Sequence, residues 1–251
     1  MWFQLYLWSD REAGISLVRR AEAAGFRALI LTVDTPVAGA RLRDVRNGFT
    51  IPPTLSIRTL IDIGLHPGWW FDKLTTDPLQ FAVFTETGGT VADLINRVFD
   101  PTITVADLAW IRKEWDGPIV IKGIQTPEDA CMVVDAGADG IIISNHGGRQ
   151  LDRAPTPLEQ LAPIRAALGR RAEVYLDGGV LSGSDMVAAV ALGADAVLVG
   201  RAYLYGLMAG GERGVARAAE LLRKEAVRTM QLLGVSRVAD LDGSSARLRN
   251  P

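Results

Sequence analysis

The stretch that decides the fold is Gly140-Ile141-Ile142-Ile143-Ser144-Asn145-His146-Gly147-Gly148-Arg149, in which an apolar run ends abruptly in polar residues and glycines. A continuous apolar run is typical of a parallel strand that is covered on both faces. Histidine takes up and releases protons near neutral pH, and the donor fork of arginine matches a carboxylate. The end of this strand is therefore predicted to carry a proton acceptor and an anion-binding group. The alternative is a structural histidine beside a solvated turn.

Similar apolar runs alternate with amphipathic helical stretches along the chain. We predict strands at residues 2–7, 28–33, 119–122, 140–144, 173–176 and 196–199, and helices at 10–24, 104–114, 127–136, 157–168, 184–192 and 212–233. Strands that are each followed by a helix predict a parallel sheet. Units of similar length, with polar groups at each strand end, favour a TIM (β/α)8 barrel over an open doubly wound sheet. With six strands found, we expect the last six βα units of such a barrel, with helix 212–233 packed on it.

A long insertion follows the second predicted strand. Residues 35–101 depart from the repeat within what we interpret as a single barrel domain of residues 1–251. They include Ile51-Pro52-Pro53, His66-Pro67-Gly68-Trp69-Trp70-Phe71 and Phe81-Ala82-Val83-Phe84. Long insertions in compact domains usually form lids or binding loops. An aromatic insertion suits a membrane surface or an electron acceptor, and surface helices packed on the barrel are an equal alternative.

Composition excludes several classes of protein. The chain has 251 residues, 48% of them hydrophobic, and a formal net charge of −2, which gives no electrostatic reason to expect a nucleic-acid partner. Cys131 is the single cysteine, so no intramolecular disulfide can form. Met1 is followed at once by a predicted core strand, with no charged leader, so no signal peptide is expected. A chain that begins inside a core strand leads us to expect a shortened barrel.

Two glycine-containing turns predict a phosphate site. Asp177-Gly178-Gly179 and Gly200-Arg201 follow the strands that would be seventh and eighth in a complete barrel, where phosphate is usually bound. Glycine N–H groups and a helix N-terminus bind the anion, and Arg201 adds charge. Taken alone, Asp-Gly-Gly is equally well explained as a tight turn. The remaining strand ends carry Gln4 and Tyr6, Thr32 and Asp34, and Lys122.

Together these groups indicate a flat phosphorylated cofactor across the barrel mouth. Lys122 is a suitable partner for a ring that becomes anionic on reduction. Asp34 is a candidate to orient His146 and to stabilise its imidazolium, with a cap on the turn before Pro36 as the alternative. Arg41, just beyond a flexible turn, is a candidate to join Arg149 in clamping a carboxylate.

The motifs at the strand ends resemble those of the FMN-dependent α-hydroxy acid dehydrogenases and oxidases. The matching stretches are Phe3-Gln4-Leu5-Tyr6, Thr32-Val33-Asp34-Thr35-Pro36, Lys122-Gly123-Ile124, residues 144–152, Asp177-Gly178-Gly179 and Gly200-Arg201-Ala202. Their order and spacing are kept over essentially the whole chain. Within the family, residues 45–53 and 66–71 look most like the bacterial respiratory L-lactate dehydrogenases.

The resemblance implies a role for each candidate residue. His146 would accept the proton while two electrons pass to FMN, Arg149 and Arg41 would hold the substrate carboxylate, and Tyr6 would contact the substrate. The residues implied at the isoalloxazine or ribityl portion are Gln4, Thr32, Lys122 and Ser144. Those implied at the ribityl phosphate end are Asp177, Gly178, Gly179, Gly200 and Arg201.

The resemblance also implies the substrate and partners. We expect oxidation of a small L-2-hydroxy acid, L-lactate first, with electrons passed to quinone, a cytochrome or oxygen. Glycolate or mandelate as substrate, an inactive fragment, and a phosphate-binding barrel isomerase or aldolase with Lys122 as a Schiff base are the alternatives. A cytoplasmic location, peripheral contact with the inner face of the cell membrane and a homo-oligomeric full-length form are also expected.

Two features depart from the family pattern. The family generally has an arginine where this chain has Leu181, so weaker FMN binding is expected. The first two barrel strands have no counterpart. An open six-stranded sheet would expose two unpaired edges, so we expect the isolated chain to fold poorly or to bind little flavin. Stoichiometric bound FMN would contradict that expectation.

Overall fold

The computed structural model describes residues 1–48, 56–76 and 99–248. The chain divides into two compact units. The first consists of Met1–Ala40 with Asp100–Pro251, and the second is Arg41–Phe99. Residues 51–53 and 81–84 of the predicted insertion lie outside the described part of the chain. Each unit is described below by itself.

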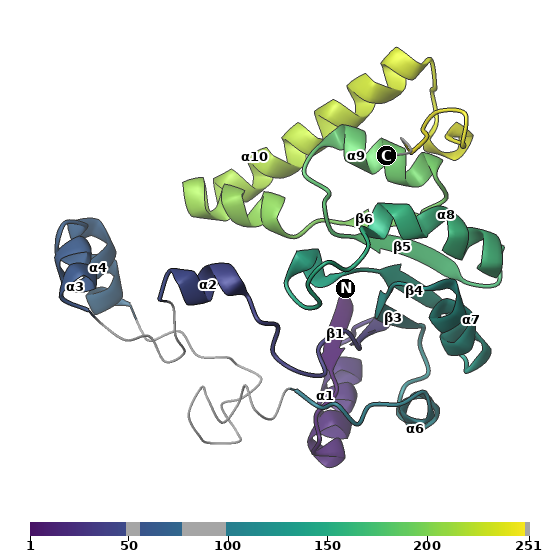
Figure 1. Ribbon diagram of the computed structural model, residues 1–251, viewed down its shortest axis with the longest axis horizontal. Coiled ribbons are helices and arrows are strands. Elements are labelled where there is room, and N and C mark those ends of the chain that lie inside the picture. Colours follow the sequence, from purple (N-terminus) through teal and green to yellow (C-terminus); the bar gives the residue numbers. More distant parts are fainter. Residues whose placement is uncertain (49–55, 77–98, 249–251) are drawn as a thin grey trace. The chain divides into compact units, whose positions relative to one another are not determined.

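The first unit is built on a parallel six-stranded sheet. Its strands are β1 (Trp2–Tyr6), β2 (Ala28–Thr32), β3 (Ile119–Ile124), β4 (Gly140–Ile143), β5 (Glu173–Asp177) and β6 (Ala196–Leu198). Each strand pairs with its neighbour in the sequence, so the spatial order is the chain order, and β1 and β6 are the two edges of the described sheet (Figure 1). The strand bounds differ from the predicted ones by two residues at most.

The strand order decides between the two predicted architectures. A doubly wound sheet reverses direction at a switch point, and its helices cover both faces. Here every crossover advances by one strand in the same direction, and right-handed crossovers then place all the helices on one face. The other face is turned inward, as in a barrel wall. The predicted fold, six units of a TIM-type barrel, is confirmed.

The five crossover helices include four that begin at side-chain caps, whereas the one that begins at Ala106 has none. They are α1 (Arg11–Ala23), α6 (Ala106–Glu114), α7 (Pro127–Asp135), α8 (Pro157–Leu168) and α9 (Gly183–Ala191). Thr126 accepts a hydrogen bond from the Asp129 amide, and Thr156 forms a reciprocal capping box with Glu159. Caps of this kind satisfy backbone N–H groups that would otherwise lack a partner at the first turn. For this reason the helix starts could be predicted closely from the sequence.

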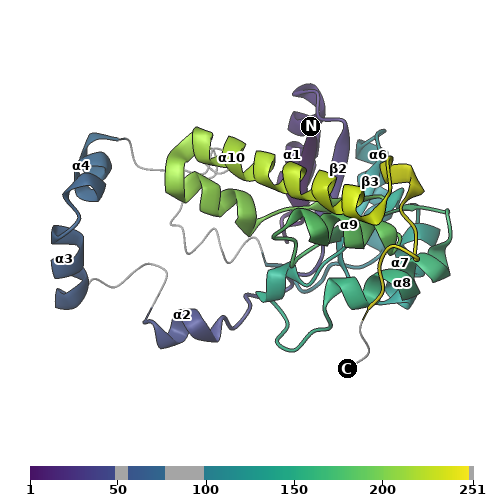
Figure 2. The same cartoon turned by 90° about the horizontal axis from the view of Figure 1, so that it is seen from above.

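The last helix differs from its prediction. Helix α10 (Arg201–Leu233) begins 11 residues before residue 212, and Gly210 and Gly211 leave the helical conformation inside it. At this kink the two halves fold back, so that the backbones of Gly206 and Gly214 meet. The longer half lies along α9 (Figure 2), and α10 has no fully buried residue among those described. At Leu222 and Ala226, in the predicted packing face, the backbone of α10 lies against Gly183 at the start of α9, whereas Leu233 is 42% exposed, so the helix packs on the barrel but lacks the buried face that was predicted.

The two faces of the sheet have different roles. Residues in register on parallel strands point to the same side. One set, which includes Leu31 and Ile121, packs under α6 and α7. The opposite, inward set forms a buried layer of Ile30, Val120, Ile142 and Tyr175, with Leu198 packed against it. At the carboxyl ends, the same inward face carries polar side chains instead, namely Tyr6, Thr32, Lys122, Ser144 and Asp177. This change from apolar to polar places the candidate site.

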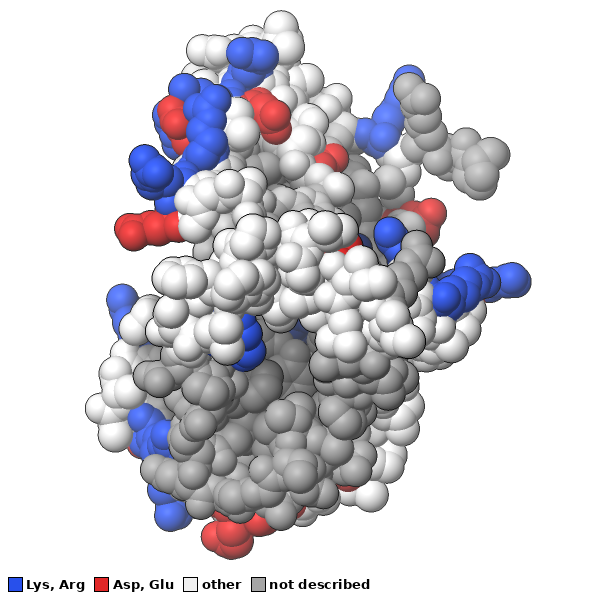
Figure 3. All heavy atoms as spheres, turned by 90° about the vertical axis from the view of Figure 1, so that its left-hand side faces the viewer, with Lys and Arg blue, Asp and Glu red and all other residues white. Residues whose placement is uncertain are grey.

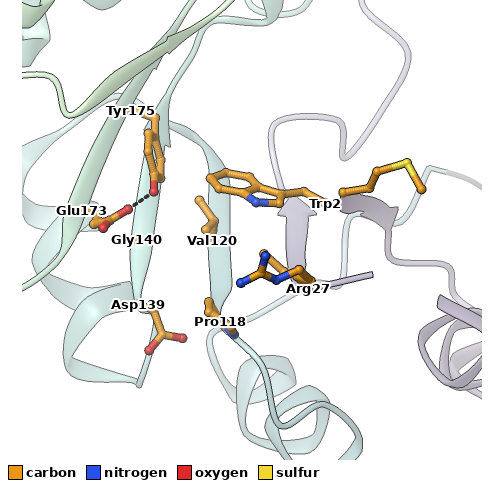
Figure 4. A pocket seen from close by; sticks show the side chains of 10 residues that line it. Trp2, Arg27, Pro118, Val120, Asp139, Gly140, Glu173 and Tyr175 are labelled. Carbon is orange, nitrogen blue, oxygen red and sulfur yellow. Dashed lines mark hydrogen bonds between the residues drawn. The ribbon is translucent and has the colours of Figure 1, made fainter. Parts of the chain in front are cut away.

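At the amino ends of the strands, the inward face opens into a cavity of about 460 Å³. The rings of Trp2 and Tyr175 meet edge to face across it, with centroids 5.3 Å apart. Figure 4 shows the Tyr175 hydroxyl directed at the Glu173 carboxylate, while Arg27 and Asp139 lie lower on the rim. This end of the sheet is thus lined by two aromatic rings and bordered by charged side chains.

The second unit contributes three short helices, α2 (Leu42–Arg46), α3 (Ile57–Gly64) and α4 (Pro67–Thr75). Ser56 caps α3 by accepting from the Thr59 amide. The two longer helices, with the C-cap Leu65 of α3, present large exposed apolar side chains, which are Ile57, Leu60, Ile61, Leu65, Trp69, Trp70, Phe71 and Leu74. Within the described residues, no helix has both the length and the apolar character needed to cross a bilayer.

Candidate active site

The candidate base sits in a single 3-10 turn, His146–Gly148, which Ser144 and Asn145 separate from the end of β4. Two local hydrogen bonds hold the turn. The His146 amide donates to Ser144 Oγ (3.0 Å), and the Gly148 amide donates to Asn145 Oδ1 (3.1 Å). His146 itself has a φ of 56°, a conformation that few side chains adopt outside glycine. The local hydrogen bonds therefore fix the backbone from which the imidazole projects.

Asp34 is the tertiary partner of this histidine. Its Oδ1 lies 3.0 Å from His146 Nδ1, and the Asp34 side chain is 6% exposed. When Nδ1–H donates to the carboxylate, the neutral imidazole presents Nε2 as the acceptor. The structure therefore brings together the predicted His146–Asp34 pair, in a geometry suited to proton uptake at Nε2. The alternative of Asp34 as a simple turn cap does not account for this contact.

A glycine whose packing role was not predicted makes room for the carboxylate. Gly123 has a φ of 109°, and a Cβ there would lie 2.5 Å from the Asp34 Cβ. The pairing of β3 with β4 is irregular between Lys122 and Ile124, so the glycine sits in a bulge. A glycine inside an apolar strand is a known sign of a bulge or a close backbone approach. That signal was present in Lys122-Gly123-Ile124.

No role was predicted for Gln150 from the sequence. Its Nε2 donates to the backbone oxygens of Asp34 (3.1 Å) and Val37 (3.0 Å), which ties the loop after β2 to the loop after β4. Gly39 approaches the Arg149 carbonyl so closely that a Cβ would collide with it. These contacts hold together the two loops that carry Asp34 and His146. No local pattern in the sequence predicts a bond between residues more than 110 positions apart.

Lys122 lies at the centre of a buried polar cluster on the inward face. Its Nζ donates to Ser144 Oγ (3.1 Å) and lies 3.2 Å from Asp177 Oδ2 and 4.0 Å from Asp34 Oδ2. The Ser144 hydroxyl donates in turn to Asp177 Oδ2 (2.7 Å). Lys122 is 7% exposed and Ser144 fully buried. One buried cation thus stands among two carboxylates beside the candidate base.

Strands β1 and β2 add neutral polar groups. Gln4 Nε2 donates to Thr32 Oγ1 (2.9 Å) and to the Tyr6 hydroxyl (3.3 Å). Burial raises the pKa of Tyr6, and the charges of Asp34 and Asp177 raise it further. Tyr6 therefore keeps its proton around neutral pH and remains a hydrogen-bond donor. Tyr6 is in register with Thr32, and Thr32 is in register with Lys122, so Tyr6 lies on the same face of the sheet as the cluster.

The predicted phosphate end forms a cavity of about 450 Å³ between the loops after β4 and β5 and the start of α10. Its polar lining includes Arg201 and the backbone of Gly178 and Gly179. Arg201 Nη2 donates to the Gly147 carbonyl (3.0 Å), which links this cavity to the turn that carries His146. Two amides in the first turn of α9 are already used, because Gly183 donates to Glu225 Oε2 and Asp185 donates to Ser182 Oγ. The anion donors that remain here are Arg201 and the glycine amides.

The two predicted carboxylate-binding arginines fall in different units. Arg149 is exposed and directly follows the His146–Gly148 turn in the first unit. Arg41 begins the second unit and immediately precedes α2, with a left-handed φ of 41°. Their joint action on a substrate carboxylate stays a prediction. On the face shown in Figure 3, Lys and Arg side chains lie among Asp and Glu side chains and do not gather in one basic patch.

Comparison with known proteins gives a consistent result. The profile of the FMN-dependent dehydrogenase family matches residues 1–248. The chain is 58% identical over 240 residues to a Mycobacterium tuberculosis protein named "Putative L-lactate dehydrogenase", with 96% of this chain and 58% of that protein covered. It is 43% identical over 257 residues to an L-lactate dehydrogenase of Caulobacter vibrioides, with 100% and 67% covered.

A solved structure is also similar. The crystal structure of the monotopic membrane protein (S)-mandelate dehydrogenase superimposes with a TM-score of 0.91 at 40% identity, covering 97% of this chain and 66% of that one. The chain thus spans 58% to 67% of the length of the three proteins compared.

Proposed function

Because the chain belongs to the FMN-dependent dehydrogenase family, we propose that it oxidises a small L-2-hydroxy acid with FMN as cofactor and L-lactate as the first candidate substrate. The observation that carries the proposal is the contact of His146 Nδ1 with Asp34 Oδ1 at 3.0 Å, beside the buried Lys122. A histidine oriented by a carboxylate is suited to take a proton from a hydroxyl group. The names of the L-lactate dehydrogenase relatives support lactate.

The residues present fit a flavin nucleotide. Three buried side-chain oxygens among the described residues have no hydrogen-bond partner, and one of them is Asp34 Oδ2. Gly200 has a φ of −105°, and a Cβ added there would have no atom within 4 Å. Packing within the chain therefore does not explain why this residue is glycine. Arg201 and the glycine amides supply donors for a phosphate. Gln4, Thr32, Lys122 and Ser144 would face the ring and ribityl portions, and Asp177, Gly178, Gly179, Gly200 and Arg201 the phosphate end.

The chain's own residues account for binding and proton transfer. FMN, when bound, supplies a two-electron acceptor. His146 Nε2 accepts the hydroxyl proton, and Asp34 stabilises the imidazolium that results. Arg149, with Arg41, binds the substrate carboxylate through paired N–H donors. Tyr6, kept protonated by burial and by its carboxylate neighbours, donates to the substrate.

The exact acid and the electron acceptor form the finer part of the proposal. Mandelate is the second candidate substrate, favoured by the similarity to (S)-mandelate dehydrogenase, and glycolate is the third. We take a quinone or a cytochrome as the acceptor, with oxygen as the alternative. A Schiff-base isomerase or aldolase is the less favoured class, because Lys122 Nζ is engaged by Ser144 and Asp177.

The second unit supports contact with a membrane surface. Trp69, Trp70 and Phe71 are 56%, 40% and 63% exposed on α4, and aromatic side chains of this kind favour the membrane–water interface. The monotopic membrane neighbour points the same way. We propose peripheral attachment through α3 and α4 on the cytoplasmic face of the cell membrane. A full-length homo-oligomer is proposed from the family resemblance alone.

The proposal is tested by flavin binding and turnover. The purified chain is mixed with FMN, and bound flavin is read from its visible absorbance; L-lactate, mandelate and glycolate are then assayed with a dye acceptor. His146→Gln should lower L-lactate-dependent dye reduction by about 10³-fold while bound flavin is retained. The matched control is His66→Gln, the only other histidine in the sequence. Unchanged turnover in His146→Gln would overturn the assignment of the base.

A further inference from the structure

The Asp34 carboxylate is shared unequally between two neighbours. Its Oδ1 contacts His146 Nδ1, whereas its Oδ2 is buried and has no hydrogen-bond partner. A cation stands close to that oxygen, because Lys122 Nζ lies 4.0 Å away. Since an unpaired buried oxygen costs free energy, Lys122 would gain by moving the remaining ångström. Some other contact must hold it back.

Asp177 and Ser144 supply that contact. Lys122 Nζ lies 3.2 Å from Asp177 Oδ2 and donates to Ser144 Oγ at 3.1 Å. The Ser144 hydroxyl uses its full capacity, because it donates to Asp177 and accepts from Lys122 and from the His146 amide. A third N–H of the ammonium is left for a further partner. Ser144 thus joins the lysine to the backbone of the base.

We propose that Asp177 and Ser144 are positioning residues, which hold the Lys122 ammonium away from Asp34 and so leave the Asp34 carboxylate to the His146 imidazolium. The inference deepens the proposed function, because it rests on His146 as the base. It gives Asp177 and Ser144 a role within the chain, beside the cofactor contacts proposed for them. Neither residue needs to touch the substrate.

The charges of the cluster give the direction of the effect. With His146 neutral, Lys122, Asp34 and Asp177 sum to −1, and protonation of His146 brings the sum to zero. If Asp177 loses its charge, Lys122 pairs with Asp34, and the imidazolium loses part of its counter-charge. Within the described residues, two further titratable groups lie near the cluster: Tyr6 from β1, neutral because its pKa is raised, and Arg201 from α10, which bonds Gly147. Both are unchanged in every variant compared.

The test follows the ring resonances of His146 by NMR as the pH is varied, with His66→Gln to assign the two histidines. Asp177→Asn should lower the titration midpoint of His146 by about one pH unit. Lys122→Met should raise it. In the Lys122→Met background, Asp177→Asn should lower the midpoint by less than half as much as it does in the otherwise unchanged chain, because no lysine ammonium remains to move to Asp34. The matched control is Asp135→Asn, which removes a carboxylate paired with Arg171 at the end of α7, and it should leave the midpoint unchanged.

Equal effects of Asp177→Asn with and without Lys122 would show simple charge loss and would overturn the proposal. If Asp177→Asn fails to fold, Ser144→Ala serves instead and should also lower the titration midpoint of His146. Ser144→Thr, which keeps the hydroxyl, should restore the midpoint. An unchanged midpoint in Ser144→Ala would also overturn the proposal. The titration needs neither FMN nor substrate. Absent lactate turnover with the expected midpoints would therefore overturn the proposed function and leave the positioning role standing.

Discussion

The two ends of the sheet use aspartate in opposite ways. At the amino end, Asp139 Oδ2 accepts from the Ile119 amide and from Arg112, and Asp195 Oδ2 accepts from the Val174 amide and from Arg165. Both aspartates lie in a repeated Gly-Ala-Asp turn just before a strand, and both are largely exposed. At the carboxyl end, Asp34 and Asp177 are buried around one lysine, and one oxygen of Asp34 is left without a partner.

The difference supports the proposal that the carboxyl end of the sheet carries the active site. The described buried side-chain atoms that lack a partner are Asp34 Oδ2, Gln125 Oε1 and Gln150 Oε1, and each belongs to a loop that follows a strand. Polar atoms left unpaired in a folded chain cost stability unless a ligand completes them. At the amino end, the aspartates fasten adjacent strands together, so their contribution is to stability. Substitutions at the two ends should therefore have separable effects.

The largest effect is expected from Gly123→Ala. The new Cβ would lie 2.5 Å from Asp34 Cβ at a φ of 109°, so both the strand and the carboxylate must shift. We expect a loss of at least about 3 kcal/mol of unfolding free energy together with nearly all L-lactate turnover. Denaturant unfolding and the dye assay measure the two losses. Gly137→Ala, also at positive φ but with open space around it, should cost less stability and spare turnover.

The second largest effect is expected from Asp34→Asn, which should lower activity without a matching loss of stability. The amide keeps the shape of the side chain but cannot balance an imidazolium, so turnover should fall about 10²- to 10³-fold. Steady-state kinetics with L-lactate measure the fall, and Asp139→Asn at the amino end serves as the control. A comparable fall in Asp139→Asn would break the distinction between the two ends.

Asp195→Asn should have the reverse effect, a loss of stability without a loss of turnover. It weakens contacts with the Val174 amide and with Arg165 at a site where the carboxylate is 41% exposed. Allowing for solvent screening, we expect a loss of about 1 kcal/mol, or a fall in Tm of about 2–4 °C, with kcat unchanged. Thermal unfolding and the dye assay together test this, and an unchanged Tm with lowered kcat would contradict it.

The smallest effect concerns the alkaline limit of stability. Because burial, Asp34 and Asp177 raise the pKa of Tyr6, the folded chain holds this proton to a higher pH than the unfolded chain does. Stability should therefore fall as the pH rises from about 10, the ordinary tyrosine value, to the raised folded value. Tyr6→Phe should flatten that fall in denaturant titrations. Tyr203→Phe, at an exposed tyrosine, should leave it as steep.

Much of the fold could be predicted because its signals are local. Apolar runs such as Gly140–Ile143, and caps such as Thr126 before Pro127, act within a few residues, and the observed bounds lie close to the predicted ones. Helix α10 was predicted poorly for the opposite reason. Gly210 and Gly211 suggest a helix end, whereas the halves on either side pack back on each other through Gly206 and Gly214, which is a tertiary contact.

The same difference between local signals and tertiary contacts applies to the candidate site. Residue types and strand ends indicated His146, Asp34 and Lys122, because parallel strands bring their carboxyl ends to one edge. The role of Gln150 came only from the structure, since it joins loops far apart in sequence, and although a glycine within an apolar strand indicated a bulge at Gly123, only the structure showed that Gly123 faces the Asp34 carboxylate.

By itself, the amino-acid sequence determined that six apolar strands alternate with helices and which chemical groups end each strand, because periodicity and capping are properties of short segments. Only the tertiary structure decided that every crossover advances in one direction, and that Lys122 stops 4.0 Å short of Asp34. The physical reason is that such distances depend on competing contacts from several strands at once, and no single segment of sequence contains all of the competitors.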